Sequence, residues 1–274
     1  MKMQPEATAA DAQNYESEEY KAKTEPGANA NFIWYIDRFP YLKKLQAYSF
    51  FTYVLGVNKL IRLVDPKAKQ PFLSIEDYPE LKILQDNWKV IREEFEQLVA
   101  KQPLPNLQDI SSPQSVITSD DKWKTYILKV FGKMVDKNCE AMPKTAALLR
   151  QVPGMEAAMF SVIHGNKHVP PHRGGYCGLV RAHLGVKVPQ PAEQCRIKVD
   201  GETVHWDDGS LFIIDDTCLH EAWNDSDEVR VVVLIDLRRR LPWPLTALNK
   251  SVLKVMSMLN ISTEVFDNLE RFRS

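Results

Sequence analysis

CRIKVDGETVHWDDGSLFII, residues 195–214, is typical of three short strands joined by two tight turns. Asp200-Gly201 separates two runs rich in β-branched residues, and Asp-Gly in that setting is a strong signal for a two-residue hairpin. Asp208-Gly209 marks a second turn before SLFII. Similar short runs lie on either side of this stretch: AAMFSVI and CGLVRAHLGV before it, and VRVVVLIDL after it. Evenly spaced strands of this kind predict a sandwich or jelly roll whose interior can hold a small ligand.

The residues before 155 show helical periodicity instead. One helix is predicted with Asp77 as its N-cap and with apolar residues three and four apart from Leu81 to Leu98. The same spacing predicts a second helix from Trp123 to Met134. A third helix is expected to open at Pro143 and to end before Pro153-Gly154.

Together these patterns predict an α+β chain. Its core is expected to be a double-stranded β-helix, that is, a cupin-like jelly roll, with flanking helices mostly N-terminal to it. We divide the sequence into a disordered polar tail over 1–30, a helical part over 31–154 packed on the barrel, the jelly-roll core over 155–240, and a C-terminal amphipathic helix over 241–274.

Charge and cysteine usage limit the functional classes. The chain has 35 basic and 36 acidic residues, so no overall field attracts nucleic acid, and we expect no nucleic-acid partner. The four cysteines form no CxxC pair and are too few for a disulfide framework, which favours a reducing compartment. The first thirty residues lack the apolar core of a signal peptide. We therefore expect a cytoplasmic protein.

A membrane-spanning helix is not expected, because the longest apolar run, Tyr48–Val57, is shorter than the roughly 20 residues that a span needs. Residues 32–64 do mix aromatic side chains with lysine and arginine. This composition suits a helix at a membrane interface, and it also suits an ordinary helix that covers the core. Peripheral contact with the inner membrane therefore stays open.

The histidines gather in one region. All six lie between His164 and His220, inside the predicted β half. No HExxH motif, nucleophile elbow or glycine-rich phosphate loop is present. His172 and His220 stand at the ends of two separate strands, which can converge on the cavity of a jelly roll. Arg230, ten residues after His220, could bind a dicarboxylate there, and this order is the pattern of iron and 2-oxoglutarate enzymes.

Longer motifs add a resemblance to a known family. The runs PHRGGYCGLVRAHLG, DGETVHWDDGS, IIDDTCLHEAWND and VRVVVLIDLRR resemble the aspartyl/asparaginyl β-hydroxylase family of iron and 2-oxoglutarate dioxygenases, over about residues 155–240. Within that family the nearer likeness is to bacterial lipid A 2-hydroxylases. It extends upstream through FLSIEDYPELKILQDNWKVIREE, DKWKTYILK and MPKTAALLRQVPGMEAAMF.

The resemblance implies roles for six residues. It makes His172 and His220 ligands of iron(II), with 2-oxoglutarate as cosubstrate and dioxygen as oxidant. It implies that the far carboxylate of 2-oxoglutarate is bound by Arg230, with His183 and Ser161 as further contacts. A catalytic role falls to Arg181, which would face the substrate or the cosubstrate carboxylates. The ordinary alternative is that the serine and His183 are satisfied core residues and that the arginines pair with acids on the barrel wall.

One position departs from the common iron pattern. The facial triad places a carboxylate two residues after the first histidine, and Gly174 stands there. Asp215 or Asp216 could supply a carboxylate instead. They could also fix the loop or orient a ligand histidine through its second nitrogen.

The sequence leaves the substrate open. The leading hypothesis is hydroxylation at carbon 2 of a lipid A-type acyl chain. The alternatives are β-hydroxylation of an aspartyl or asparaginyl group in a peptide or free amino acid, halogenation at the position that Gly174 leaves empty, and a non-catalytic jelly-roll binding protein. As partner we expect a small-molecule or lipid substrate, and the oligomeric state is not predicted.

Overall fold

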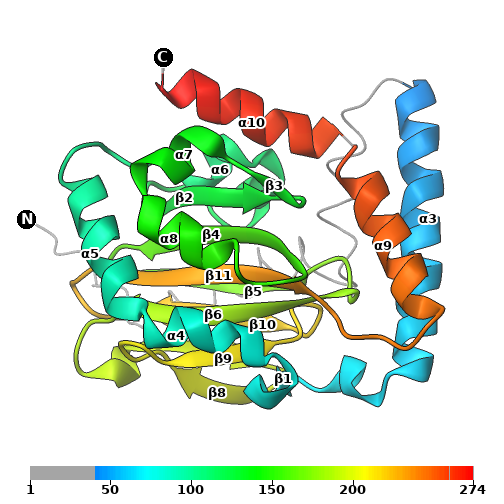
Figure 1. The fold of residues 1–274 in the computed structure, drawn as a ribbon, viewed down its shortest axis with the longest axis horizontal. Helices are drawn as coiled ribbons and strands as arrows, with labels where there is room; N and C mark the ends of the chain where they lie inside the picture. Colours follow the sequence, from blue (N-terminus) through cyan, green and yellow to red (C-terminus); the bar gives the residue numbers. More distant parts are fainter. Residues whose placement is uncertain (1–40, 259, 274) are drawn as a thin grey trace, which may run out of the picture.

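Two antiparallel sheets form the centre of the computed structural model, which describes residues 41–258 and 260–273 (Figure 1). The larger sheet has seven strands in the order β1 (Phe72–Leu73), β9 (Leu211–Ile214), β6 (Leu179–Lys187), β11 (Arg230–Arg238), β4 (Met155–Ile163), β2 (Trp123–Val130) and β3 (Lys133–Met134). The smaller sheet has the order β5 (Lys167–His172), β10 (His220–Asn224), β7 (Cys195–Val199) and β8 (Glu202–His205). The predicted jelly-roll core is confirmed.

The hairpin between β7 and β8 forms where the Asp-Gly pair predicts it. Asp200 and Gly201 have φ angles of 44° and 94°, and Val199 pairs with Glu202 across the turn. A two-residue turn with positive φ at both positions matches the twist of the flanking strands. This turn sets the register of the smaller sheet.

Helices cover the outer face of the larger sheet (Figure 1). Phe95 of α5 stacks on Phe160 of β4, with ring centroids 4.6 Å apart. Successive side chains of a strand point to opposite faces of the sheet, so every second side chain of these strands points to the smaller sheet. There, side chains such as Leu234 form a second apolar cluster, which also includes Trp206. The covering helices are α4 (Lys82–Asp86), α5 (Trp88–Val99), α7 (Asp136–Ala141) and α8 (Pro143–Leu149).

The helix predicted from Trp123 to Met134 is wrong. Trp123–Val130 is strand β2, which pairs with β4, and Lys133–Met134 is β3. Both faces of β2 are buried: Leu128 packs under the helices, and Ile127 packs on the opposite side beneath α10 (Asn260–Arg273). A strand buried on both faces loses its polar alternation, so apolar residues at helical spacing occur by coincidence. The part over 31–154 is therefore helical only in part.

The first predicted helix is present but divided. A 3₁₀ turn, Pro79–Leu81, precedes α4, and Asn87 separates α4 from α5. Asp77 does not cap this helix; it ends an earlier turn and pairs with Lys67 at 2.6 Å. The helix that opens at Pro143 is confirmed as α8.

The ends of the chain hold the remaining helices. The C-terminal segment forms two helices, α9 (Leu245–Met256) and α10, where one was expected. Helix α3 (Tyr41–Val64) packs beside α9 (Figure 1). The tail predicted over 1–30 lies outside the described residues. Short turns complete the fold: Pro66–Lys69, Ile75–Asp77, α6 (Leu107–Ile110), Ser112–Val116 and Ala192–Gln194.

Candidate active site

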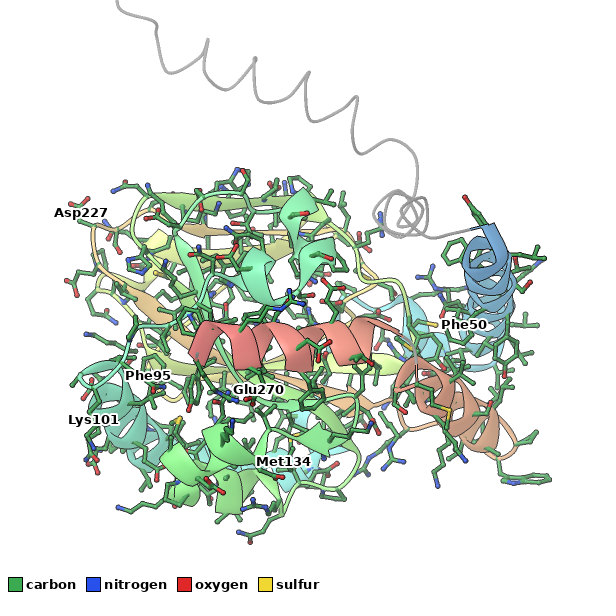
Figure 2. All side chains as sticks on the ribbon, turned by 90° about the horizontal axis from the view of Figure 1, so that it is seen from above. Phe50, Phe95, Lys101, Met134, Asp227 and Glu270 are labelled. Atoms are coloured by element: carbon green, nitrogen blue, oxygen red, sulfur yellow. The ribbon has the colours of Figure 1, made fainter. Side chains whose placement is uncertain are left out.

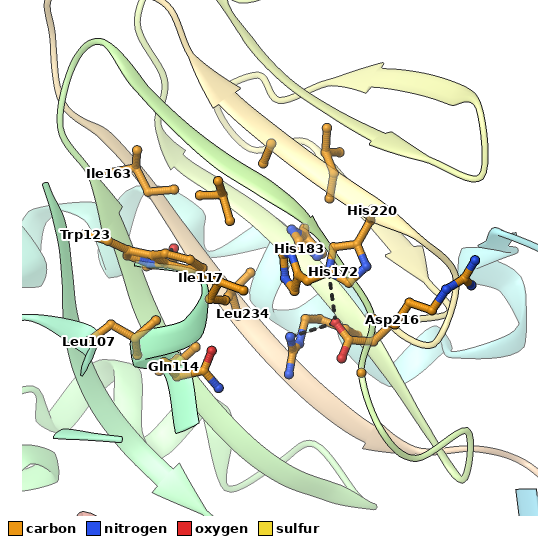
Figure 3. A pocket seen from close by; sticks show the side chains of 18 of the residues that line it. Leu107, Gln114, Ile117, Trp123, Ile163, His172, His183, Asp216, His220 and Leu234 are labelled. Carbon is orange, nitrogen blue, oxygen red and sulfur yellow. Dashed lines mark hydrogen bonds and ion pairs between the residues drawn. The ribbon is translucent and has the colours of Figure 1, made fainter. Parts of the chain in front are cut away.

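A cavity of about 320 Å³ lies between the two sheets. Strands supply its histidines, Ser161, Arg181 and Arg230, whereas the segment from α6 to Ile117 closes one side with Leu107, Gln114 and Ile117 (Figure 3). The wall is mostly apolar. It also contains all six residues to which the resemblance assigns roles: Ser161, His172, Arg181, His183, His220 and Arg230.

His172 and His220 form a cross-strand pair. His172 ends β5, His220 begins β10, and the two residues are direct antiparallel partners. Their ring centroids are 4.1 Å apart at an interplanar angle of 55°. The pairing register shifts just beyond them, at the Pro170-Pro171 segment of β5, and such irregularities re-aim side chains at functional sites.

Both rings present the same nitrogen to the cavity. Nδ1 of His172 lies 2.8 Å from the Pro170 carbonyl oxygen, and Nδ1 of His220 lies 2.9 Å from that of Cys218. A carbonyl only accepts, so each Nδ1 carries the proton and each Nε2 keeps a lone pair. Burial lowers the pKa of His172 to about 3 and that of His220 to about 4. The pair therefore consists of neutral imidazoles, the form that binds a metal ion.

Asp216 fills the space beside this pair that Gly174 leaves open. Its Oδ1 lies 3.5 Å from Nε2 of His220. A Cβ atom placed on Gly174 would lie only 2.1 Å from Oδ2 of Asp216. Glycine is therefore required for the carboxylate to reach this position. Asp215, by contrast, points away from the cavity and holds its loop through Thr217 and Arg239.

Arg230 begins β11 and is buried in the same cavity. One of its terminal nitrogens donates to Ser161 Oγ at 3.0 Å, and its guanidinium lies 4.3 Å from the centroid of the Trp206 ring. Its Nε has no partner, and no ion pair joins it to an aspartate or glutamate within residues 41–258 and 260–273. Burial without a counter-charge lowers the pKa of Arg230 to about 10. This cation is positioned to receive an anion.

His183 and Trp206 add further unpartnered polar atoms. His183 stacks on Phe212, with centroids 5.0 Å apart, and neither of its ring nitrogens has a partner in the described part of the chain. Trp206 Nε1 is also buried and has no hydrogen-bond partner in the described part of the chain. Burial lowers the pKa of His183 well below its usual value. Native proteins seldom leave such groups unpaired, so His183 and Trp206 mark this part of the cavity wall as a candidate ligand site.

Arg181 is already satisfied. Its Nε and one terminal nitrogen donate to Asp236 at 2.7 and 3.0 Å, and the other terminal nitrogen donates to Asp216 at 2.7 Å. Burial acts to lower the pKa of Arg181, but the two carboxylates outweigh it and raise the pKa. This one cation thus already has two counter-charges.

The structure brings the six expected residues to one cavity, and their roles remain predictions. The clustering of all six histidines was a weaker guide. His168 lies on β5 outside the cavity, where it pairs with Glu221 and stacks on Trp223, and His205 is exposed. Sequence reasoning gave no role to Trp206, although it ends the ETVHW run, or to Trp123, whose Nε1 donates to Ser161 Oγ at 3.0 Å.

Over the described residues, no group of three or more histidine, cysteine, aspartate or glutamate side chains is arranged to hold a metal ion. A metal at this site would therefore have the two imidazoles as its protein ligands, with Asp216 next to them. Sites with few protein ligands leave positions for a cosubstrate and a second reactant.

Comparison with known proteins decides the family. Residues 85–240 match the family model described as aspartyl/asparaginyl β-hydroxylase. The chain belongs to this family. The sequence motifs that indicated it, including the segments around His172 and His220, fall within the matched range.

Two relatives show the breadth of the aspartyl/asparaginyl β-hydroxylase family. An ornithine lipid ester-linked acyl 2-hydroxylase from Rhizobium tropici is 36% identical over 72% of this chain and 71% of its own length. The aspartyl/asparaginyl β-hydroxylase of Homo sapiens is 31% identical over 58% of this chain, a match that spans 21% of the human protein. Both are hydroxylases, so this chain is an oxygenase of the same kind.

A solved prolyl-4-hydroxylase from Pseudomonas putida matches 57% of this chain and 88% of its own length. It has 16% sequence identity and a TM-score of 0.39, a likeness too distant to say anything of function.

Proposed function

We propose that this protein is an iron(II)- and 2-oxoglutarate-dependent hydroxylase that acts at carbon 2 of an acyl chain in a polar lipid. The observation that carries the proposal is the content of one cavity. It contains a pair of neutral imidazoles, His172 and His220, together with a buried arginine, Arg230, that has no counter-charge. A metal ligand set and an anion site in one apolar space are what this chemistry requires.

The imidazole pair suits iron(II) because both Nε2 atoms are unprotonated and lie on adjacent strands. Their Nδ1 atoms are held by backbone carbonyls, which fixes the orientation of each ring. Asp216 adds a negative charge close to where a divalent cation would lie. These residues would hold the metal with little rearrangement.

The unpartnered atoms suit 2-oxoglutarate. Arg230 would bind the far carboxylate, with Ser161 beside it and with donors from Trp206 and His183 close by. Charge-assisted bonds of this kind are strongest in a water-poor site. When iron and cosubstrate are bound, such sites convert a C–H bond, 2-oxoglutarate and dioxygen into a C–OH group, succinate and carbon dioxide.

The lipid substrate is supported by the lining of the cavity and by the Rhizobium relative. Leu107, Ile117, Ile163 and Leu234 form an apolar wall that could hold part of an acyl chain and exclude water from the reacting carbon. The printed name of the relative specifies an ester-linked acyl group of ornithine lipid. Lipid A-type and ornithine lipids share this acyl chemistry, so both belong in the test.

Arg181 argues against an aspartyl or asparaginyl substrate. In that alternative its guanidinium would bind the substrate carboxylate, but Asp216 and Asp236 already accept from three of its five N–H groups, one on each nitrogen. A further carboxylate would have to displace one of them. A neutral acyl chain meets no such competition.

Halogenation is disfavoured for a related reason. A halide ion could bind the metal only where the facial-triad carboxylate is missing, which here is at Gly174. In this structure the Asp216 carboxylate lies against Gly174. Its negative charge would repel a halide ion.

The non-catalytic alternative predicts no turnover of 2-oxoglutarate.

The test is turnover by the purified protein with iron(II), ascorbate and 2-oxoglutarate. Substrates are a lipid A extract, an ornithine lipid and a peptide containing aspartate and asparagine, and the readouts are succinate and a mass gain of one oxygen. We expect the mass gain on an acyl chain. His172→Ala should abolish it, whereas His168→Ala on the outer side of the same strand should not. Oxidation of the peptide alone, or no succinate with any substrate, would overturn the proposal.

A further inference from the structure

Helix α3 is apolar on more than one side. Val54, Val57 and Ile61 face inward and pack with Val252 and Leu253 of α9. On an ordinary surface helix the remaining sides would be polar. Here the outward residues include several large apolar side chains.

These exposed side chains concentrate at one end of the molecule. Leu63 is 81% exposed, and Trp243, in the loop before α9, is 84% exposed. Figure 2 shows α3, with Phe50 labelled, at the end opposite Phe95 and Lys101 of the α5 region. We call this set the α3–α9 surface; its exposed apolar residues are Leu45, Leu55, Leu60, Leu63, Val64, Trp243, Val255 and Met258.

The charge of this surface has one sign. Neither the 24 residues of α3 nor the 12 residues of α9 include an aspartate or glutamate, although the chain has 36 acidic residues. Among the side chains that the structure describes on the two helices, the exposed basic ones are Lys59, Arg62, Lys250 and Lys254. Apolar side chains among cations, without anions, complement an interface of anionic headgroups over hydrocarbon.

The α3–α9 surface is attached to the rim of the cavity. Asn58 of α3 donates to the Gly175 carbonyl oxygen at 2.9 Å and accepts from the Cys177 amide at 3.0 Å. Arg62 donates to Thr217 Oγ1 at 2.9 Å. Gly175 lines the cavity, and Thr217 follows Asp216, which also lines it. A flat partner bound to α3 would therefore lie next to the loops that border the site.

We infer that the α3–α9 surface docks the protein on an anionic lipid bilayer. Among the described helices, none is long and apolar enough to cross a membrane. The helices would lie along the interface, with Leu63 and Trp243 inserted among the acyl chains and the lysines at headgroup level. This inference goes beyond the proposed function, because it concerns binding to a bilayer that contains no substrate.

Vesicle flotation tests the inference without any turnover. The protein is mixed with phosphatidylcholine vesicles, with or without phosphatidylglycerol, in the absence of iron and 2-oxoglutarate. We expect flotation with the anionic vesicles, weaker binding at high salt, and little binding to phosphatidylcholine alone. Because no substrate is present, failure here would leave the hydroxylase proposal intact, and failure of turnover would leave this inference intact.

Variants locate the surface. Leu63→Glu with Trp243→Glu should weaken vesicle binding by about tenfold or more, because each removes an inserted apolar group. Val99→Glu on α5, also an exposed apolar residue, is the matched control and should float like wild type. Lys59→Glu with Lys254→Glu should weaken binding to anionic vesicles in the same direction. All four changed side chains on the surface are exposed, and circular dichroism should confirm the fold.

Three results would overturn the inference. The first is no flotation of the wild-type protein. The second is equal flotation of the double variant Leu63→Glu with Trp243→Glu and of the Val99→Glu control. The third is a lipid-free dimer, seen by light scattering, that Leu63→Glu dissociates, because a second copy of the chain would then cover this surface.

Discussion

Replacing Gly174 by alanine tests the central geometry of the site. The new Cβ would lie 2.1 Å from Oδ2 of Asp216, and ordinary contact begins near 3.4 Å, so the carboxylate must withdraw by about 1.3 Å. That movement breaks its 2.7 Å ion pair with Arg181, although Asp236 still holds the guanidinium. A buried pair costs about 3–5 kcal/mol to break and an exposed pair less than about 1. For this partly exposed pair we expect a loss of about 1–2 kcal/mol.

The assay is thermal unfolding followed by fluorescence. A loss of that size lowers the melting temperature by about 2–4 °C in a chain of this length. Gly175→Ala is the matched control, because a Cβ at Gly175 meets nothing within 4 Å. In an Asp216→Ala background most of the cost of Gly174→Ala should disappear, since the carboxylate at 2.1 Å is gone and only the backbone oxygen of residue 216, at 3.2 Å, stays close. Equal melting of the two glycine variants, or an equal cost without Asp216, would refute the reasoning.

Three further predictions concern the ligand site, pH and a helix end. Arg230→Ala should raise the 2-oxoglutarate concentration needed for half-maximal turnover about 100-fold, because a buried charge pair is worth about 2–5 kcal/mol; an unchanged requirement would remove this residue from the site. Burial lowers the pKa of His172 to about 3 and that of His220 to about 4, below the unfolded value of 6.5. The unfolded chain therefore binds more protons in this window, so the free energy of unfolding of the metal-free protein should fall as pH drops from about 6.5 to about 4. Urea titrations measure this, and a flat profile would contradict it. Glu94→Ala should cost about 1–3 kcal/mol, because the carboxylate accepts the first amides of α8, at 2.8 and 2.7 Å; the exposed neighbour Glu93→Ala should cost little in the same titration.

The β half of the fold could be predicted because its signals are local. Asp200-Gly201 specifies a turn whatever lies around it, and strands with one solvent-facing side show alternation. Strand β2 could not be recognised in this way. Its identity depends on pairing with β4, some thirty residues later in the sequence, and on the helix α10 that covers Ile127. The residues of β2 themselves carry no pattern that indicates either neighbour.

The candidate site shows the same division. The motifs around His172 and His220 are long enough to be recognised, and strand ends in a jelly roll converge, so their meeting could be predicted. The pairing of Arg181 with two carboxylates could not be predicted. Its partners Asp216 and Asp236 stand 35 and 55 positions away, and no local pattern tells which arginine receives two carboxylates and which, as with Arg230, receives none.

The residues that line the cavity stand on two kinds of backbone, and these differ in how well they tolerate changes of sequence. Its histidines, Ser161, Arg181 and Arg230 stand on hydrogen-bonded strands, where a slip of one position would turn Ser161 or Arg230 to the opposite face of the sheet. Leu107, Gln114 and Ile117 come from short turns outside either sheet, which tolerate insertion and exchange. New substrates could therefore evolve, or be engineered, through changes in residues 107–117 that leave the strands of the candidate site as they are.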